Sequence, residues 1–439
     1  MISVILFYLT NLIGYLLPFF YAPIFAFTLY QLIYYFHPEK RWWGVLVPEI
    51  SYSFFAVLLM IFVLLININL FSKNKILSIP QFKWAYFLVF LYGIAYFYAI
   101  SPVFHLVAFN YFLKLLIIIT IAYKLCNNSK HLDIILYGHI IGAWYMSFYI
   151  FQVGRNSGSR VEGVGTVDSP DANGIAATLA PVLVLCLYNF LVAKNNSTKL
   201  IFVLAGVFIA DALVLINSRG AFLGAASSIV FFLFYMYFSK FQRKHQKKLV
   251  IFIIITGLAG SIYLMDDNFK QRMFSITKQA EVDSSKESGG TRMIYWMAAW
   301  EMAKDYPFGN GYRGFNHYSP IYIPANVNTG RSKNRSVHST WFETLSEVGY
   351  LGLFSLCLML YYSYSTLNKC KKILQKQEKI NDYFKVLAIQ AALIAFIVSM
   401  TFLNRMRAEV LYWIILYSAC AYNIYVVKEE ANQDKKVIN

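Results

Sequence analysis

Charged residues are scarce in this chain: they make up 14% of its 439 residues, whereas hydrophobic residues make up 58% and the mean hydropathy is +0.51. A soluble protein of this size could not bury so much apolar surface. Apolar runs of about twenty residues recur along the whole length, which is the pattern of a multi-span helical membrane protein. We therefore predict an all-α polytopic membrane protein with about 12 transmembrane helices.

Cysteine motifs are missing as well. The five cysteines form no CxxC pair and no Cys/His spacing of a zinc site, which argues against a disulfide framework and against a structural metal. The N-terminal apolar stretch, residues 2–36, has no positively charged region before it, so we expect no cleavable signal peptide. The formal net charge of +17 indicates contact with anionic membrane lipid rather than with nucleic acid.

The expected apolar spans divide the chain into three parts. They lie near residues 3–36, 51–71, 84–101, 106–125, 133–152, 172–193, 200–217, 220–238, 249–265, 349–367, 386–403 and 409–427. The first is either one long tilted helix or a hairpin broken at Pro18 and Pro23. We expect an N-terminal transmembrane bundle over 1–265, a long periplasmic loop with amphipathic active-site helices over 266–348, and C-terminal transmembrane helices with a cytoplasmic tail over 349–439.

Lysine-rich segments set the expected orientation of the chain. They occupy residues 240–248, 369–385 and 428–436, and the positive-inside rule places all three in the cytoplasm. The outer face then receives residues 153–171, 217–220, 266–348 and 404–408. The segment "HPEKRWW", residues 37–43, also falls outside, against the same rule.

Arginines separate from the lysines in this topology, because Arg243 alone is cytoplasmic. The arginines expected on the outer face are Arg155, Arg160, Arg219, Arg272, Arg292, Arg313, Arg331, Arg335, Arg405 and Arg407. The guanidinium is a planar fork suited to bidentate contacts with phosphate. The set therefore indicates a site for a phosphorylated ligand, although individual members have pairing with Asp and Glu, or lipid headgroups, as alternatives.

Two outer segments place an arginine at the start of a helix. "NSRGAFLG", residues 217–224, begins a span with Arg219, and Ser218 is a candidate cap for that helix. A tight turn with a snorkelling arginine is the alternative. "RMIYWMAAWEMAKDYPFGNGYRGF", residues 292–315, predicts an amphipathic interfacial helix that begins at Arg292 and ends in a Pro/Gly turn.

The segment "HSTWFETLSEVGYLG", residues 338–352, leads from polar sequence directly into a span. Thr340 and Glu343 match a capping box, so we expect a helix from Thr340. Glu343 and Glu347 then share the side opposite the apolar residues. His338 lies just before the helix, where a neutral imidazole can take a proton from a sugar hydroxyl; a structural histidine bonded to the loop is the alternative.

This combination resembles the superfamily of O-antigen ligases and O-antigen polymerases. The family motif of His, then Asn/Ser/Gln, nine residues, Gly, two residues and Gly/Thr/Tyr is matched by His338, Ser339, Gly349 and Gly352. "SRG" at 218–220 and "GGTRMIYW" followed by "YPFGNGYRGF" look like the arginine segments of the family. "HSTWFETLSEVGYLGL" and "HPEKRWWG" are also similar to its branch of exosortase-associated O-glycosylation ligases.

The resemblance implies a glycosyltransferase of the bacterial inner membrane with its active site facing the periplasm. Its donor is a glycan on a polyprenyl diphosphate, such as undecaprenyl diphosphate, and its acceptor is a glycolipid, a protein or a growing glycan. No metal, cofactor or nucleotide sugar is needed. His338 is then the catalytic base, Arg219 and Arg292 bind the diphosphate, and Arg160, Arg313, Arg405 and Arg407 are further candidates for substrate binding.

Three other functions stay open at this stage. A polymerase of O-antigen or exopolysaccharide differs from a ligase only in its acceptor, which the sequence does not reveal. A flippase or transporter of lipid-linked glycan would more often show two matching halves and polar residues at mid-membrane, and no internal repeat is visible. A scaffold of a glycan-export complex would not require His338.

Overall fold

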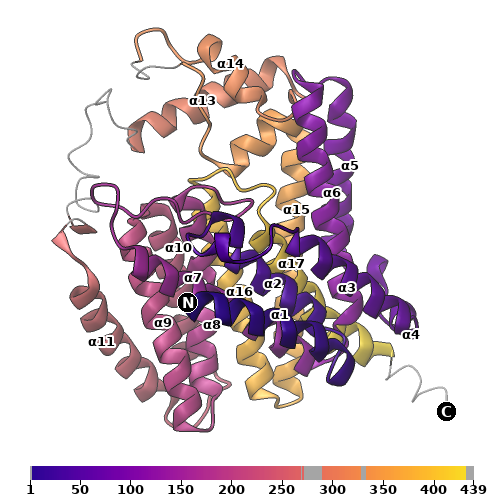
Figure 1. Cartoon of the computed structure of the whole chain (residues 1–439), viewed down its shortest axis with the longest axis vertical. Coiled ribbons are helices and arrows are strands. Elements are labelled where there is room, and N and C mark those ends of the chain that lie inside the picture. Colours follow the sequence, from indigo (N-terminus) through magenta and orange to yellow (C-terminus); the bar gives the residue numbers. More distant parts are fainter. Residues whose placement is uncertain (1, 268, 271–288, 328–332, 432–439) are drawn as a thin grey trace.

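The computed structural model describes residues 2–267, 269–270, 289–327 and 333–431 (Figure 1). Within these residues the chain is helical and has no β-strand, as predicted. The α-helices are α1 (Ile2–Phe20), α2 (Phe25–Phe36), α3 (Tyr52–Ile66), α4 (Asn69–Lys73), α5 (Pro80–Ile94), α6 (Pro102–Leu125), α7 (Ser129–Val153), α8 (Ala172–Val192), α9 (Asn196–Ile216), α10 (Arg219–Phe238), α11 (Gln246–Leu264), α13 (Gly289–Asp305), α14 (Gly314–Tyr322), α15 (Thr340–Lys376), α16 (Ile380–Met400) and α17 (Glu409–Tyr422).

The helices confirm a polytopic membrane fold. In the described ranges, ten are long and apolar enough to cross a membrane, or eleven if the bent pair Tyr52–Ile66 and Asn69–Ser78 is one span. The expected number was slightly higher because α3 and α5 have only 15 residues each. A bilayer core needs about 20 helical residues, so these apolar stretches are shorter than a full crossing.

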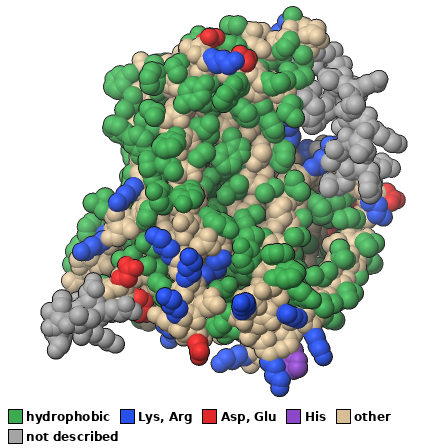
Figure 2. Space-filling model, turned by 180° about the vertical axis from the view of Figure 1, so that it is seen from behind, with side chains coloured by type: hydrophobic (Ala, Val, Ile, Leu, Met, Phe, Trp, Pro, Cys, Tyr) green, Lys and Arg blue, Asp and Glu red, His purple; other side chains and the backbone are tan. Residues whose placement is uncertain are grey.

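The burial of the helices shows which ones form the centre. The most apolar windows of α16 and α17 are 83% buried by neighbouring helices, whereas that of α11 is only 6% buried. The side chains that α11 exposes include Ile251, Phe252, Ile255 and Ile262. Leaving them in water would cost roughly 25 cal/mol per Å², so α11 is stable as an outer helix only in lipid. Figure 2 shows hydrophobic side chains over most of one face of the molecule.

The N-terminal apolar stretch forms the hairpin that was one of its two predicted arrangements. Helix α1 ends at Phe20 and α2 begins at Phe25, with Pro23 in the turn between them. Pro18 stays inside α1. Proline at position 23 has no N–H to continue a helix, so the break falls there.

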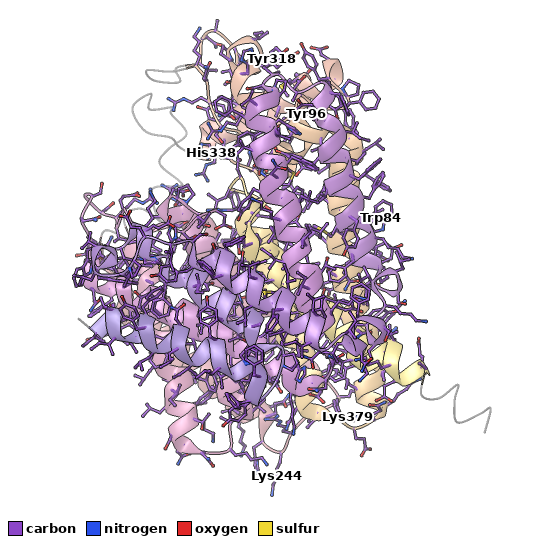
Figure 3. All side chains as sticks on the ribbon, turned by 45° about the vertical axis from the view of Figure 1, so that its right-hand side comes forward. Trp84, Tyr96, Lys244, Tyr318, His338 and Lys379 are labelled. Atoms are coloured by element: carbon purple, nitrogen blue, oxygen red, sulfur yellow. The ribbon has the colours of Figure 1, made fainter. Side chains whose placement is uncertain are left out.

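The two ends of the molecule differ in composition. Lys244 and Lys379, from two of the lysine-rich segments, lie together at one end, and His338 and Tyr318 lie toward the other (Figure 3). Helices α13 and α14 form a layer beyond the main bundle at the His338 end, beside the tips of α5 and α6 (Figure 1). The two lysine segments therefore share an end, as the predicted topology requires.

The segment 37–43 has a structural reason for carrying its arginine. Arg41 is buried and donates to the carbonyls of Phe36 (3.0 Å) and Tyr35 (3.2 Å), and its guanidinium lies 4.6 Å from the centre of the Tyr149 ring. The charge is thus held inside the protein by backbone carbonyls and an aromatic ring. It is not a free loop charge of the kind that orients a membrane protein.

Candidate active site

The backbone around His338 is held by the turn between α16 and α17. The Asn404 side chain donates to Ser336 Oγ (2.7 Å) and accepts from the Ser339 N–H (3.0 Å). Thr340 Oγ1 donates to the Leu403 carbonyl (2.7 Å). Hydrogen bonds on both sides of His338 therefore fix its position relative to a turn that comes more than sixty residues later in the chain.

His338 adopts a backbone conformation that is uncommon for a residue with a side chain. Its φ is +48°, in the left-handed region, and its side chain is half-buried. Such conformations cost about 1–3 kcal/mol and persist only where the surroundings enforce them. The hydrogen bonds of Asn404 to Ser336 and Ser339 supply that constraint.

An aromatic cluster joins the three segments that carry the predicted site residues. Trp296 of α13 stacks on Phe342 of α15, with ring centres 5.8 Å apart, and lies 6.1 Å from the Phe402 ring. Its indole N–H donates to the carbonyl of Val337 (3.1 Å), the residue before His338. We call Trp296, Phe342 and Phe402 the aromatic hinge.

Arg219 and Arg292 both approach this hinge. Arg292 is four residues before Trp296 on α13, so it lies one turn away on the same side. Arg219 precedes Gly220, where an added Cβ would be 3.2 Å from the Cβ of Phe402. Arg219, Arg292 and His338 are all half-buried. The backbone positions next to Arg219, Arg292 and His338 thus all lie at the aromatic hinge.

Glu343 and Glu347 pair with Arg407, whereas Glu343 was expected to cap the helix that begins at Thr340. Their side chains are only 7% and 4% exposed, and both accept hydrogen bonds from Arg407, Glu343 at 3.0 Å. Glu347 also accepts from the Tyr92 hydroxyl (3.1 Å) and from the Arg313 backbone N–H (3.1 Å). The pair is buried opposite the apolar side of α15 because the 404–408 turn covers it there.

The two glycines of the histidine motif permit a close approach of two segments. Gly349 has φ +72° and kinks α15, and a Cβ there would lie 2.1 Å from the carbonyl oxygen of Pro307. The Tyr350 N–H donates to that same oxygen (3.0 Å). Gly352 lies one turn after Val348, whose side chain fills the space where a Cβ of residue 352 would lie. The predicted Pro/Gly turn therefore packs directly on the kink below His338.

The remaining candidate arginines contact protein groups. Arg160 donates to the Ile216 carbonyl (3.1 Å) and to Asn173 (2.7 Å). Arg405 is buried and donates to the Asp168 carbonyl (2.7 Å) and to Ser169 (2.9 Å).

Arg313 and Arg407 differ in their exposure. The Arg313 side chain is exposed and lies 5.3 Å from the centre of the Tyr312 ring. Arg407 is 13% exposed and paired with two carboxylates. Of the four lower-ranked arginines, Arg313 presents its guanidinium most openly, whereas Arg407 is the one whose charge is most fully balanced within the described residues.

Helix α15 begins at Thr340, as expected, but the two expected side-chain caps do not form. Ser218 precedes α10 but its side chain makes no capping hydrogen bond. Thr340 does not form a capping box with Glu343, since its hydroxyl bonds to Leu403 and the Glu343 carboxylate accepts from the N–H of Met406 (3.1 Å) and from Arg407. The residue before the helix is Ser339. The side chains of Thr340 and Glu343 therefore bond to residues of a distant turn, and not to the backbone at the start of their own helix.

Asn404 and Tyr92 were not singled out from the sequence. Their contribution depends on which turn or helix lies beside them, and no local spacing reports that. A signal did exist for the Arg407 pair, because two glutamates four apart on one helix require a buried cation if that side is covered.

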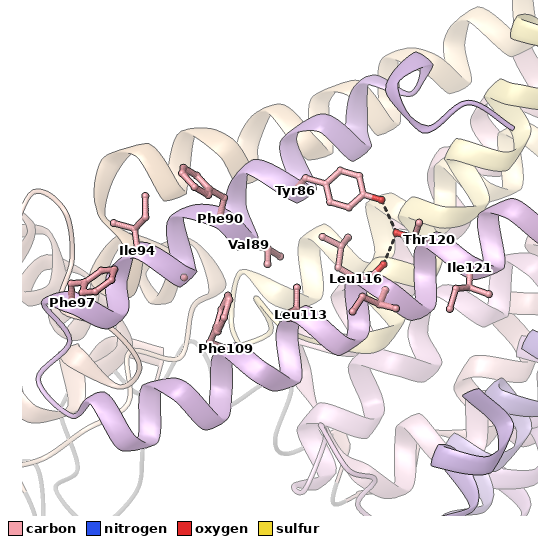
Figure 4. A pocket seen from close by; sticks show the side chains of 12 residues that line it. Tyr86, Val89, Phe90, Ile94, Phe97, Phe109, Leu113, Leu116, Thr120 and Ile121 are labelled. Atoms are coloured by element: carbon pink, nitrogen blue, oxygen red, sulfur yellow. Dashed lines mark hydrogen bonds between the residues drawn. The ribbon is translucent and has the colours of Figure 1, made fainter. Parts of the chain in front are cut away.

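An apolar groove lies on the outside of the bundle between α5 and α6 (Figure 4). It has a volume of about 640 Å³. Phe97 and Ile94 are at its end nearest the α13–α14 layer, and the hydrogen bond from Tyr86 to Thr120 (2.6 Å) is near the other. In a membrane this groove faces lipid chains.

The family comparison agrees with the site. The model of the family described as O-Antigen ligase matches residues 200–357. The predicted resemblance to the O-antigen ligase superfamily is thereby confirmed. The matched segment contains Arg219, Arg292, Arg313 and His338, while Arg160 and the 404–408 turn lie outside it. None of the curated proteins compared with this chain matches it.

The match supports glycan transfer of the O-antigen ligase kind, from a lipid-linked glycan to an acceptor, by a multi-pass bacterial membrane protein. Among the described residues, no group of three or more His, Cys, Asp and Glu side chains is placed to hold a metal ion. The cysteines Cys126, Cys186, Cys357, Cys370 and Cys420 are all free.

Proposed function

We propose that this protein transfers a glycan from a polyprenyl-diphosphate carrier to an acceptor hydroxyl, with His338 as the general base. The observation that carries the proposal is the position of His338: Asn404 bonds to Ser336 and Ser339 on either side of it, and Val337 before it accepts from Trp296 of the aromatic hinge. A base must lie within hydrogen-bond reach of the proton it removes. Residues that must react in one geometry are expected on a rigid framework.

The proposed reaction needs a base that deprotonates the acceptor hydroxyl and cations that stabilise the leaving diphosphate. The acceptor hydroxyl gives its proton to the imidazole while its oxygen forms a bond to the anomeric carbon of the glycan. The bond between that carbon and the diphosphate oxygen breaks, and the diphosphate leaves with the electron pair. Attack from the side opposite the leaving group inverts the anomeric centre.

Arg219 and Arg292 stabilise the charge that develops on the diphosphate. Donors placed in advance where charge appears stabilise a transition state without reorganisation. Arg313, which is exposed on the same layer, is a further candidate for contacting the donor. In this proposal the active site faces the periplasm and the lysine segments face the cytoplasm.

Arg160, Arg405 and Arg407 are positioning residues in this proposal. Arg405 and Arg407 lie in the 404–408 turn that holds His338. The Arg405 guanidinium bonds to Asp168 and Ser169, and the Arg407 guanidinium bonds to Glu343 and Glu347. These bonds keep that turn in place. A polymerase would use the same chemistry with a sugar hydroxyl of another carrier-linked chain as acceptor.

A His338→Gln variant tests the proposal. Glutamine retains hydrogen-bonding capacity but cannot act as a base near neutral pH, so transfer by purified protein from a carrier-linked glycan should fall by about 10²–10⁴-fold. His317→Gln, at an exposed position on α14, is the matched control and should transfer normally. Transfer by His338→Gln at the parental rate would mean that His338 only supports the loop.

A further inference from the structure

His105 is a buried histidine near the start of α6 that the proposed reaction does not use. It is 0% exposed, and both of its ring nitrogens have hydrogen-bond partners. Nδ1 accepts from the backbone N–H of Tyr312 (2.9 Å), and Nε2 lies 2.8 Å from the carbonyl oxygen of Tyr92. The imidazole therefore connects the end of α5 to the turn that precedes α14.

These two bonds determine where the imidazole carries its proton. Since Nδ1 accepts a hydrogen bond it has no proton, and Nε2 carries the proton that it donates to Tyr92. Tyr92 is in the last turn of α5, where carbonyl groups have no partner within the helix. The Tyr92 ring also stacks on the imidazole, with ring centres 4.5 Å apart. His105 is thus held as the neutral tautomer with its proton on Nε2.

The Pro/Gly turn 307–313 lies directly against the tip of the α5–α6 hairpin. Gly311 has φ +74°, and a Cβ there would lie 2.4 Å from the Cβ of Ala99 and 3.0 Å from Nδ1 of His105. A larger residue at position 311 would push the two segments apart. Glycine at this position therefore permits the approach that brings the N–H of Tyr312 to the imidazole.

Arg313 adopts an uncommon backbone conformation that this turn enforces. Its φ is +59°, in the left-handed region, which residues with a side chain rarely adopt. Such a conformation persists only where the surroundings impose it. The N–H of Tyr312 is bonded to His105, and the N–H of Arg313 itself donates to the Glu347 carboxylate (3.1 Å). These two successive bonds, to α6 and to α15, set the direction in which the Arg313 side chain leaves the turn.

The guanidinium of Arg313 is presented to solvent in that direction. The side chain is exposed and lies 5.3 Å from the centre of the Tyr312 ring. The Arg407 guanidinium lies 4.9 Å from the centre of the same ring, which helps to keep the ring in place. A guanidinium that is already directed loses less conformational freedom on binding, and its planar fork suits a diphosphate.

The Arg313 turn and the His338 segment share one carboxylate. Glu347 accepts from the N–H of Arg313 and from the guanidinium of Arg407. Arg407 belongs to the 404–408 turn, which holds the His338 segment. The position of Arg313 is therefore fixed relative to the candidate base as well as to α6.

We propose that His105 is a positioning residue for the glycan donor: its neutral imidazole holds Tyr312 so that the Arg313 guanidinium is directed at the carrier diphosphate. The identity of the ligand rests on the proposed function. Binding of the diphosphate does not require transfer, so the two proposals can be tested separately.

Two amide variants separate the bonds of His105. The side-chain oxygen of His105→Asn can replace Nδ1 and accept from Tyr312. The longer side chain of His105→Gln places its amide near the position of Nε2, where it can donate to Tyr92. If the bond to Tyr312 directs Arg313, the Asn variant should behave as the parent and the Gln variant should not. A histidine that only supports the end of α5 predicts the opposite order.

Binding of undecaprenyl diphosphate is the first measurement, by native mass spectrometry of the full-length protein in phosphatidylcholine nanodiscs. His105→Gln should raise the dissociation constant by about 10-fold, as expected for loss of one hydrogen bond to a charged group, and His105→Asn should leave it within about twofold. Undecaprenol, which lacks the diphosphate, should bind the parent and both variants equally. His139→Gln replaces a histidine buried in α7 and is the matched control, which should bind as the parent does.

Hydrogen–deuterium exchange reports the turn without any ligand. Backbone amides over residues 306–315 should exchange faster in His105→Gln than in the parent, because the N–H of Tyr312 loses its acceptor. In His105→Asn they should exchange as in the parent.

A double variant shows whether His105 acts through Arg313. Arg313→Ala should itself raise the dissociation constant by about 10-fold. Adding His105→Gln should cause little further change, because residues that act on one contact are not additive.

Three results would overturn the proposal: equal dissociation constants for the two amide variants, effects of His105→Gln and Arg313→Ala that multiply, or an equal loss of undecaprenol binding. If His105→Gln does not fold, the Asn variant decides, and binding about 10-fold weaker than that of the parent overturns the proposal as well.

The His338→Gln variant should bind undecaprenyl diphosphate as the parent does. If that variant transfers glycan at the parental rate, the proposed function fails and the binding results still stand by themselves.

Discussion

Arg407 donates to the carboxylate of Glu347 across the gap between the α16–α17 turn and α15, and both side chains are almost fully buried. A buried charge without its partner is strongly destabilising, by about 3–5 kcal/mol. Arg407→Met should therefore lower the midpoint of thermal unfolding in detergent much more than a surface substitution does.

The charges rather than the side-chain volumes should cause this loss. The triple variant Arg407→Met, Glu343→Gln and Glu347→Gln removes the unpaired carboxylates and should recover part of the lost stability. A triple variant less stable than Arg407→Met would contradict this explanation.

The shape of the guanidinium at two positions should matter for transfer. Arg219→Lys and Arg292→Lys keep the charge but lose the bidentate fork. Each should slow transfer by about 10- to 100-fold, since a hydrogen bond to a charged group contributes about 1.5–3 kcal/mol. Arg243→Lys, near Lys244 at the opposite end, serves as the control. Near-parental rates for both variants would reduce these arginines to an electrostatic or structural role.

Gly349 should not tolerate a side chain. Its φ of +72° and the 2.1 Å approach of Pro307 to an added Cβ both oppose alanine, so Gly349→Ala should give far less folded protein by size-exclusion chromatography. Gly257 on α11 has open space around it, and Gly257→Ala should be neutral or slightly stabilising. Equal yields of the two variants would mean that the kink is not needed.

The stability of the protein should depend on His37 at mildly acidic pH. Burial, with Arg41 and Lys40, lowers its pKa from 6.5 to about 4 in the folded protein. Between these values the unfolded chain binds more protons, so stability falls as pH drops from about 6.5 to 4.

An asparagine variant isolates this contribution. His37→Asn tolerates the left-handed φ of +40° and cannot be protonated in this range. It should lose less thermal stability than the parent between pH 7.5 and pH 4.5. Identical losses in the two proteins would assign the pH dependence to other groups.

The orientation in the membrane can be tested with two single cysteines. Glu301→Cys, exposed on α13, should react with a membrane-impermeant maleimide in intact spheroplasts, and Lys379→Cys should react only after permeabilisation. The reverse pattern would place the proposed active site in the cytoplasm and exclude it as a periplasmic site.

The transmembrane character and the position of most helices followed from the sequence, because an apolar run indicates a membrane helix whether its side chains face lipid or other helices. The count was less certain where runs were short, as in α3 and α5, since hydropathy does not show whether a helix reaches across the bilayer. His338 and its glycines stood out through the family motif. The kink that explains Gly349 appears only when Pro307 is placed beside it.

The partners of the site residues could not be predicted locally. Thr340 and Glu343 have the spacing of a capping box, yet Leu403 and Arg407 compete for the same side chains from a distant turn. Likewise, a helical projection shows which side of α15 carries Glu347 but not what covers that side. Contacts between segments far apart in sequence decided both cases.

The two hydrogen bonds of Asn404 have a consequence for how this protein can vary. They tie Ser336 and Ser339 to the α16–α17 turn, while Trp296 holds Val337, so His338 takes its position from that turn and from α13 together. A change in the α16–α17 turn can therefore displace His338, although the two lie far apart in sequence and the turn lies outside the histidine motif.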